Sequence, residues 1–519
     1  MTDHELEEPI QKVDPADVRS PFPGAAPTHL LWERHDRTHL EIVLQYPASA
    51  DGTPGEHGWD AYYFLPETFR LDASSYEKRE LFSDLRSYVR FSVPPLELDA
   101  VPDEAGTLAG RLLTESLDAG IDDLKLFASR VRRAISGGAR EIDNAVAAGA
   151  WDDVPGLVHG FVASGNAALA AVRDVMSRWK LRGVSFQQAD PELAKAAAWV
   201  DEHLSRLLEI ALVEMAAKIE GAGGPDELLG VTGEAAVNEA RYRRRRRAGP
   251  VSSVDGSVHD LERIERRHHS LKRYTSSVLW LDVEVRDGYS GAQHAFHALA
   301  AGVAMAFAVV VAVLWGQPGT TSRLGMWAAV VIVAYMGKDR LKAMLQSVFD
   351  SLIMKHLPDR RWTVRSPGTS VVLADVTERA RFIDRDDLPE DVETARSVSY
   401  RDRLEELAGP ESVLHHSKTV HVHSDAMATS APEFQSLTDV MRIDVSRWLA
   451  HTDDAKRTVT LADPEAGELF RSKLPRAYDV TVVYRLTNGA SPAAPWNVAR
   501  IVVSRNGIRR VGPPNPPPR

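Results

Sequence analysis

Residues 295–315 read AFHALAAGVAMAFAVVVAVLW and contain no formal charge. A helix of this length crosses a hydrocarbon core of about 30 Å, because each residue adds about 1.5 Å. Its Leu, Val and Phe residues favour insertion into a bilayer by roughly 3 to 4 kcal/mol in total. A shorter apolar stretch, LGMWAAVVIVAYMG, follows at residues 324–337. The two stretches predict a transmembrane helical hairpin over residues 295–337.

The second stretch is the shorter part of this hairpin. Its 14 residues make a helix of only about 21 Å. It spans a bilayer if Arg323 and Lys338 extend their side chains to the two surfaces, or if residues 320–322 join the helix. The alternative is a buried helical hairpin inside a soluble protein.

Charges beside the hairpin predict its orientation. Lys338, Arg340 and Lys342 follow it directly, whereas the connecting loop at 316–323 holds one Arg. Basic residues stay on the cytoplasmic side and contact anionic lipid there. The first residues of the chain are acidic and do not resemble an export signal. We therefore expect a two-helix protein of the cytoplasmic (inner) membrane, with both termini cytoplasmic.

Small residues recur along the first membrane helix. Ala298, Gly302 and Ala306 stand four residues apart, and a neighbouring stripe holds Ala304, Ala308 and Ala312. Small side chains let helices approach closely in lipid. One stripe is expected to pack the second helix and the other a second copy, although alanine is common throughout the chain. This pattern predicts membrane helix packing and a homo-oligomer.

The composition restricts the possible functions. The chain has 519 residues, enough for three or four structural units. Lys and Arg number 62 against 73 Asp and Glu, a net charge of −11 that argues against nucleic-acid binding. The absence of cysteine excludes disulfides, thiolate zinc sites and cysteine nucleophiles.

The N-terminal part predicts a disordered tail at 1–26 and a small α+β domain at 27–100. Alternating apolar residues at 40, 42, 44 and 46 indicate a half-buried strand, and WDAYYFLP indicates a second one. Ser74 and Glu77 form a capping-box pattern. A helix carrying Leu81, Leu85 and Val89 on one face should follow.

Residues 101–240 predict a helical bundle. Its clearest helix begins with Asp190 as the N-cap and Pro191 in the first turn. Gly137-Gly138 and Gly223-Gly224 are expected helix breaks. The apolar seam of the clearest helix has spacings of four and three, typical of a bundle or coiled coil; it consists of Leu193, Ala197, Val200, Leu204, Leu207 and Ala211.

A basic run, RYRRRRR, opens a predicted linker at 241–257. The functional interpretation is contact with anionic lipid, and the alternatives are nucleic-acid binding or a solvated linker. The expected lipid-contacting residues are Arg241, Arg243, Arg244, Arg245, Arg246 and Arg247.

The remaining chain predicts a stalk and a β-rich domain. A helix at 258–290 and an amphipathic helix at 338–357 are expected to pair beside the membrane. Residues 360–512 hold several strand patterns and an Asn506-Gly507 hairpin turn, and residues 513–519 form a Pro-rich tail. The predicted fold is thus a multidomain α+β membrane protein, with the bundle and the hairpin between the N-terminal α+β unit and the C-terminal β-rich domain.

One pair of residues suggests metal chemistry. His421 and His423 share a face if KTVHVHS is a strand, and with Asp425 they have the side chains that bind zinc. A solvent-facing polar strand explains the same residues. The motifs of nucleotide-binding loops, zinc proteases and serine hydrolases do not occur, so the sequence predicts no catalytic or cofactor-binding residues.

Two segments carry a resemblance: FLPETFRLDASSYEKRELFSDLRSYVRF, and LAAGVAMAFAVVVAV together with AYMGKDRLK. They resemble a family of bacterial membrane proteins that have a central two-helix transmembrane hairpin. The resemblance implies a membrane protein and brings no activity or site residues.

Three functions remain open at this stage. The first is a membrane-anchored cytoplasmic interaction, scaffold or sensory protein with an unknown protein partner. The second is a metal-dependent enzyme that uses His421 and His423. The third is a pore-forming membrane effector.

Overall fold

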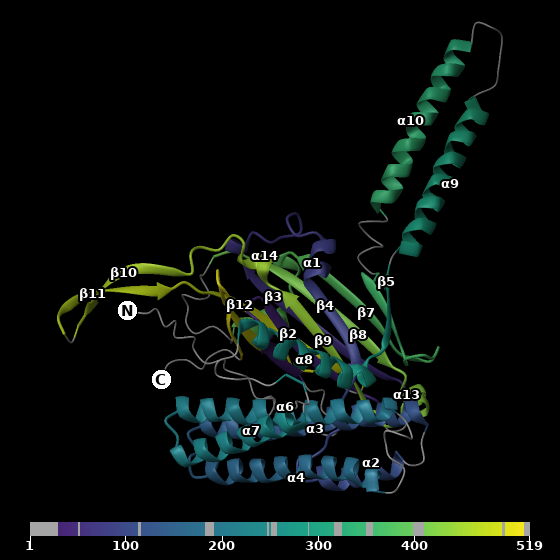
Figure 1. Ribbon diagram of the computed structural model, residues 1–519. Coiled ribbons are helices and arrows are strands. Elements are labelled where there is room, and N and C mark those ends of the chain that lie inside the picture. Colours follow the sequence, from purple (N-terminus) through teal and green to yellow (C-terminus); the bar gives the residue numbers. More distant parts are fainter. Residues whose placement is uncertain are drawn as a thin grey trace. The chain divides into compact units, whose positions relative to one another are not determined.

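A computed structural model describes most of the chain. The described residues are 30–49, 52–112, 116–181, 191–246, 249–250, 257–288, 290–315, 324–348, 357–397, 409–464, 466–489 and 494–512. The predicted tails at 1–26 and 513–519, and the loop at 316–323, lie outside them. The architecture is mixed α+β with several sheets (Figure 1).

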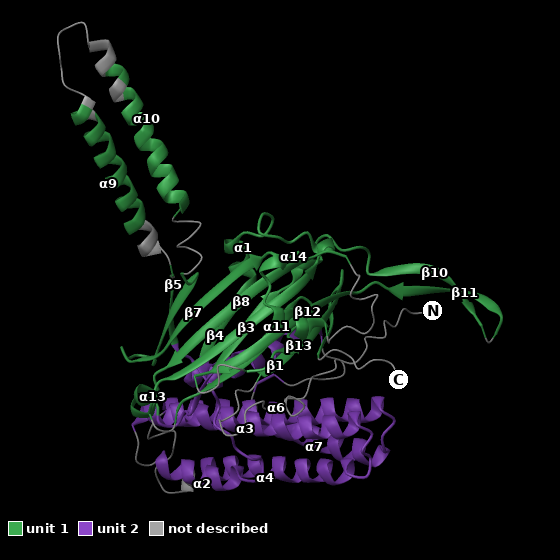
Figure 2. Cartoon of the chain, turned by 180° about the vertical axis from the view of Figure 1, so that it is seen from behind, with its two compact units in different colours: residues 1–89, 282–431, 438–519 green, residues 90–281, 432–437 purple. Residues whose placement is uncertain are grey.

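The chain divides into two compact units (Figure 2). Unit 1 contains residues 1–89, 282–431 and 438–519, and unit 2 contains residues 90–281 and 432–437. Because unit 1 is built from three separate stretches, the helical unit is an insertion into a β-rich one.

Unit 1 is built on an eight-stranded antiparallel sheet with the order β14-β13-β12-β3-β8-β7-β6-β5. Strand β3 lies in the N-terminal part of the chain and pairs with β8 on one side and β12 on the other. The strands are β3 (Gly55–Pro66), β5 (Asp282–Asp287), β6 (Arg360–Arg365), β7 (Val372–Ile383), β8 (Glu411–Val422), β12 (Tyr478–Asn488), β13 (Asn497–Ser504) and β14 (Gly507–Gly512).

A four-stranded sheet packs against one face of the larger sheet. Its order is β1-β2-β9-β4, with β1 (Leu30–Arg34), β2 (His39–Pro47), β9 (Ser436–Asp444) and β4 (Leu85–Phe91). The Trp32 ring of β1 lies 5.9 Å from Trp59 of β3 and 5.3 Å from Tyr484 of β12, centroid to centroid. The short helices of this unit are α1 (Lys78–Asp84), α11 (Glu390–Ser397), α13 (Ser424–Ser430) and α14 (Ser446–Leu449).

The strand predictions have mixed outcomes. The alternation in β2 is confirmed, because its residues 40, 42, 44 and 46 are all buried. The hairpin at Asn506-Gly507 is also confirmed, and Gly507 has a φ of 126° that favours glycine. The helix predicted through Leu85 and Val89 is wrong. Helix α1 ends at Asp84, and both residues belong to β4, where a spacing of four also places side chains on one face.

The predicted separation of an N-terminal domain at 27–100 from a C-terminal domain at 360–512 is also wrong. Strand β3 runs between β8 and β12, so both stretches contribute to one sheet. Strand pairing across several hundred residues is a non-local interaction, and the local pattern of each strand does not specify its partner.

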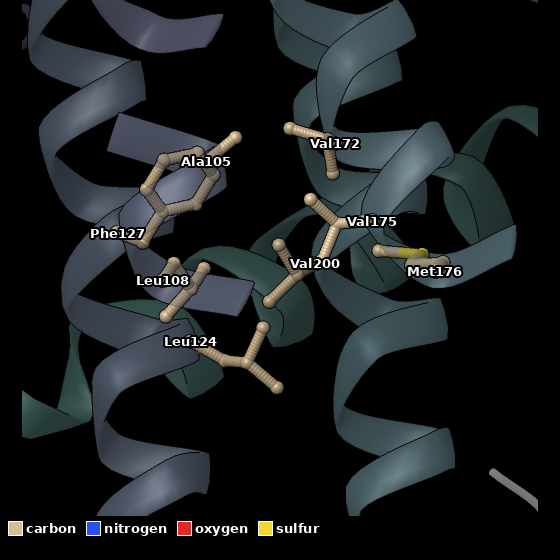
Figure 3. A pocket seen from close by; sticks show the side chains of 8 residues that line it. All are labelled: Ala105, Leu108, Leu124, Phe127, Val172, Val175, Met176 and Val200. Carbon is tan, nitrogen blue, oxygen red and sulfur yellow. The ribbon is translucent and has the colours of Figure 1, made fainter. Parts of the chain in front are cut away.

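Unit 2 is a helical bundle. Its helices are α2 (Val101–Arg111), α3 (Leu117–Ala147), α4 (Val154–Leu181), α6 (Pro191–Gly221), α7 (Asp226–Arg246) and α8 (Val258–Ser276). Helices α2, α3, α4 and α6 line a small apolar cavity of about 10 Å³ (Figure 3). This volume is just enough for one water molecule, and its lining offers little polar surface, so it is no ligand site.

The bundle extends beyond its predicted limits of 101–240. The seam of α6 is confirmed, and a run of polar residues between its apolar positions is buried as well. Helix α6 ends before Gly223, which has a φ of 71°. The helix break predicted at Gly137-Gly138 is wrong, because α3 continues through both residues. Gly138 is instead needed for close packing. A Cβ at Gly138 would lie 2.9 Å from the Phe161 ring.

The predicted linker and stalk need correction. Residues 241–246 belong to α7, and Asp190 lies outside the described residues. Helix α8 ends at Ser276 and packs in unit 2, whereas residues 338–348 continue α10 (Leu324–Val348) of unit 1. The predicted stalk helix at 258–290 is therefore wrong in its second half, because β5 (Asp282–Asp287) follows α8.

A fully buried ion pair joins the two sheets of unit 1. The ammonium of Lys418 in β8 lies 2.5 Å from Asp439 Oδ2 in β9, and neither side chain is exposed. The Tyr46 hydroxyl donates to the same oxygen, and the ammonium lies 4.3 Å from the centre of the Trp362 ring. Burial raises the pKa of Asp439, and Lys418 only partly offsets this effect.

A second buried chain of hydrogen bonds lies beside this pair. Trp59 Nε1 donates to His416 Nδ1 at 3.2 Å, and His416 Nε2 lies 3.0 Å from Glu378 Oε1. Burial favours a higher pKa for Glu378. The hydrogen bond from His416 and the charge of Lys418 outweigh it, so the pKa of Glu378 is lowered.

We predict strong coupling between Lys418 and Asp439. Lys418→Met leaves a buried carboxylate without its counter-charge and should lower the free energy of unfolding by about 3 kcal/mol. The double variant Lys418→Met/Asp439→Leu should be more stable than this single variant, because it buries no charge at that position. Urea unfolding followed by tryptophan fluorescence measures both; a double variant that loses the sum of the two single losses would contradict the coupling.

Candidate functional site

The most unusual surface of the described structure is the pair of helices α9 (Ser290–Trp315) and α10 (Leu324–Val348). They lie side by side (Figure 1). Large apolar side chains on both helices are exposed. In α9 these are Leu299, Val303, Met305, Phe307, Val309, Val310, Val313 and Leu314, and in α10 they are Ile332, Val333, Tyr335, Met336, Met344 and Val348.

Their exposure is far above that of a normal surface. Val313 and Leu314 are each 65% exposed, and Val333 is 67% exposed. Soluble monomers rarely present a contiguous apolar surface larger than a few hundred Å². These helices therefore have the surface expected of a segment whose solvent is hydrocarbon or a protein partner.

The two helices contact each other through small residues. Three alanines are almost fully buried: Ala300 and Ala304 of α9, and Ala334 of α10. A Cβ at Gly337 would lie 3.2 Å from the Phe307 ring, so this glycine also permits close approach. Small residues face inward here and large apolar residues face outward, as in membrane helices.

The structure shows which of the two small-residue stripes contacts α10. Ala298, Gly302 and Ala306 are exposed and do not form the contact with α10. The contact uses Ala304 of the neighbouring stripe together with Ala300. Two alanine stripes on one helix have the same local pattern, so the sequence could not show which of them meets α10.

Basic residues follow the apolar part of α10 without ending the helix. Lys338 is partly buried, and its ammonium lies 3.9 Å from the centre of the Tyr335 ring. Arg340 and Lys342 are exposed. A lysine whose stem follows apolar surface and whose ammonium meets a tyrosine is typical of a membrane interface.

The chain leaves the large sheet for the hairpin and returns to it at one rung. Asp287, the last residue of β5, pairs with Arg360, the first residue of β6. The Gly288 amide donates to the Asp359 carbonyl at 3.0 Å, and a Cβ at Gly288 would lie 2.2 Å from the Pro358 carbonyl oxygen. Glycine is therefore required at this position for the two chain segments to meet.

The Asp359 side chain holds this junction. It is 4% exposed. Its Oδ2 accepts the Ala380 amide of β7 at 2.9 Å, and its Oδ1 lies 2.5 Å from the Lys78 ammonium of α1. The junction is thus tied to both β7 and α1 rather than left as a free linker.

Among the described helices, α4 over Val154–Ser177 is the one that is long and apolar enough to cross a membrane, judged by length and composition alone. Ala295–Val311 of α9 counts as a shorter apolar helix. The two differ in which side chains face outward. The apolar residues of α4 lie in the bundle core, and its exposed face carries small and polar residues such as His159, Asn166 and Asp174.

The basic run of α7 is partly internal. Arg243 is 1% exposed; its Nη1 donates to Ser205 Oγ at 2.9 Å, and its Nη2 pairs with Glu209. The lipid-contact prediction is therefore wrong for Arg243. Arg241, Arg244, Arg245 and Arg246 are exposed, and Arg247 lies outside the described residues. The sequence alone does not reveal this difference, because successive arginines on a helix point in different directions and so lie in different environments.

Arg243 belongs to a polar network that the sequence analysis missed. Arg173 of α4 donates from Nε to Asp201 at 3.1 Å and from Nη2 to Glu239 at 2.6 Å. Ser205 Oγ donates to Glu239 at 2.6 Å. Burial and the hydrogen bond to Asp201 raise the pKa of Tyr242 to about 12. Each charge in this network has a partner, as buried charges require.

His203 of α6 is also buried and its environment is cationic. Neither ring nitrogen has a hydrogen-bond partner among the described residues, and its ring centroid lies 6.1 Å from that of His268. Burial lowers the pKa of His203 to about 3, and the charges of Arg132, His268, Lys272 and Arg206 act in the same direction.

The predicted metal ligands do not form a metal centre with the described side chains. His421 is exposed, and His423 Nε2 lies 2.9 Å from Asp375 Oδ2. No group of three or more His, Asp or Glu side chains within the described part of the chain is arranged to hold a metal. His421 and His423 are thus better explained as polar residues at the exposed end of β8.

Comparisons with protein-family models, with curated proteins and with solved structures give no match for this chain. The resemblance to hairpin-containing bacterial membrane proteins gains no support from them.

We predict different roles for two adjacent arginines. Arg243→Met leaves Glu209 without its buried partner and should lower the free energy of unfolding by about 3 kcal/mol. Arg244→Met, on the exposed face, should change it by no more than about 0.5 kcal/mol. Urea unfolding midpoints decide; equal losses in the two variants would show that Arg243 is not an internal residue.

We also predict an acid sensitivity that originates at His203. Its lowered pKa means that the unfolded chain takes up a proton first, so stability is lost as the pH falls below about 6.5. Between pH 7 and pH 5 this group should cost about 2 kcal/mol. His203→Leu should reduce that pH dependence, and His259→Leu on the exposed surface of α8 should keep it. Unfolding free energies at the two pH values provide the measurement.

Proposed function

We propose that α9 and α10 insert into a lipid bilayer and anchor the two units at the cytoplasmic membrane. The observation that carries this proposal is the outward-facing apolar surface of the two helices. In water this surface is unfavourable by about 25 cal/mol per Å² of apolar area, whereas in hydrocarbon it needs no partner.

Helix length supports a span by α9, whereas α10 spans the bilayer only if its ends reach the interfaces. Helix α9 has 26 residues and α10 has 25, lengths of about 39 and 37 Å against a hydrocarbon core of about 30 Å. The short second apolar stretch is not the whole of its helix, because α10 continues through Lys338 to Val348. Lys338 above the Tyr335 ring forms the interfacial end of this span, so about 22 Å of helix crosses the core and the lysine stem extends to the surface.

The charges favour one orientation. Lys338, Arg340 and Lys342 adjoin the end of the second span, and the 316–323 loop has a single Arg. The difference of two charges favours a cytoplasmic position for the flanks by roughly 2 kcal/mol. Both units and both termini are then cytoplasmic.

The proposed role of the anchored units is interaction, as a scaffold or a sensor. Their interiors are filled by paired charges and apolar side chains, and His421 and His423 offer no third metal ligand in the described part. This arrangement gives the metal-dependent enzyme no specific support. The pore-forming alternative requires several hairpins to assemble around a water-filled channel. The labelling experiment below distinguishes a pore from an anchor.

Because the chain contains no cysteine, single introduced cysteines report accessibility without background. We predict that Thr320→Cys reacts with an impermeant maleimide on intact cells, because the 316–323 loop faces outward. Ala73→Cys, exposed in unit 1, should react only after lysis. Val310→Cys should stay unreactive until the membrane is dissolved and the protein denatured.

Each alternative gives a different labelling pattern. A Val310→Cys variant that reacts in lysate as fast as Ala73→Cys places the hairpin in water and rejects the anchor. Labelling of Ala73→Cys on intact cells reverses the orientation. Loss of membrane potential on expression, with Val310→Cys accessible to water, would favour the pore.

A further inference from the structure

A two-stranded ribbon stands apart from both sheets of unit 1. Strands β10 (Lys456–Asp463) and β11 (Glu468–Pro475) pair only with each other in the described part of the chain. Leu469 is 77% exposed, Phe470 46% and Leu474 41%. A lone two-stranded ribbon is marginally stable in water, and its free edges are templates for another strand.

The ribbon is also strongly polarised in charge. At its turn end, Asp463 lies directly opposite Glu468, a like-charged pair that destabilises a ribbon by itself. Its other end carries Lys456, Arg457 and Lys473. A binding partner that matches this surface places positive charge beside the turn end and negative charge beside the other end. A second ribbon that runs antiparallel to the first has its charges in these positions.

We infer that the ribbon pairs edge to edge with the ribbon of a second copy of this chain. In such a dimer a two-fold axis stands perpendicular to the shared sheet, and the same surface is used by both copies. Side chains alternate between faces along a strand. Residues that face each other across this axis must therefore both have odd numbers or both have even numbers.

This rule selects β10 as the pairing edge. With Thr460 on the axis, Arg457 lies opposite Asp463 of the second copy, and Val459 lies opposite Leu461. Both pairs occur twice by symmetry. On β11, Glu468 has an even number whereas Arg471 and Lys473 have odd numbers, so the acidic residue never meets a basic one. The β10 edge alone gives complementary charges.

The side chains of β10 suit a shared sheet. Thr458, Val459 and Thr460 are β-branched residues that favour strands. An anionic membrane is a weaker match for the ribbon, because Asp463 and Glu468 carry negative charge at its turn. Dimerisation in this way does not depend on the membrane proposal, since the ribbon and the hairpin are separate elements.

The test uses charge reversal in the full chain, purified in detergent, with two different affinity tags. Arg457→Asp alone and Asp463→Arg alone should each weaken self-association about tenfold or more, because each places like charges opposite each other. A mixture of the two variants should associate with each other as wild type does, because both opposing pairs are then complementary. Unchanged circular dichroism confirms that the variants are folded.

A cross-link tests the register. Thr460→Cys lies on the axis opposite itself and should form a covalent dimer on mild oxidation, whereas Ser472→Cys on the outer strand should not. Gly302→Leu, on the outward stripe of α9, should leave self-association unchanged.

Several results would overturn the inference. These are a wild-type chain that is monomeric at micromolar concentration, charge variants that associate as wild type does, or loss of association in Gly302→Leu alone. Binding of the monomer to anionic vesicles through Arg457 would assign the ribbon to lipid instead.

Discussion

The architecture depends on the position of β3 inside the large sheet. This strand lies near the start of the chain, yet its two neighbours, β8 and β12, come from the C-terminal part. Once these three strands pair, the chain between them must leave the sheet and return to it, except where it adds β5, β6 and β7 as further strands. The helical bundle and the α9–α10 hairpin are two such excursions. The fully buried Lys418–Asp439 pair then fixes the smaller sheet against the larger one, because a misaligned pair would leave a charge without a partner.

The direction of the side chains distinguishes the two apolar helices of this chain. Helix α4 places Val158, Phe161 and Leu169 in the bundle core and exposes small and polar residues. Helix α9 does the opposite, burying alanines against α10 and exposing Leu and Val. In water the first arrangement satisfies the hydrophobic effect, and the second leaves it unsatisfied. The first arrangement therefore suits the core of a helical bundle, and the second suits a bilayer.

The sequence predicted those features that one local period determines. The β2 alternation and the apolar seam of α6 each need only their own residues. Features with two compatible periods were predicted wrongly: a spacing of four between Leu85 and Val89 fits a helix face and a strand face equally. Features that depend on a distant partner were not predictable at all. Arg243 looks like its neighbours in the basic run, and only the positions of Ser205 and Glu209 on another helix make it internal.

The junction at Asp359 links the hairpin to the β-sheet in a specific way. Since Asp287 and Arg360 share one rung, the sheet holds the two ends of the excursion together independently of the loop at 316–323. Closing the excursion at the sheet reduces the conformational entropy lost when the two helices pair. Through Asp359 this rung of β5 and β6, the strands at one edge of the sheet, is also bound to β7 and α1.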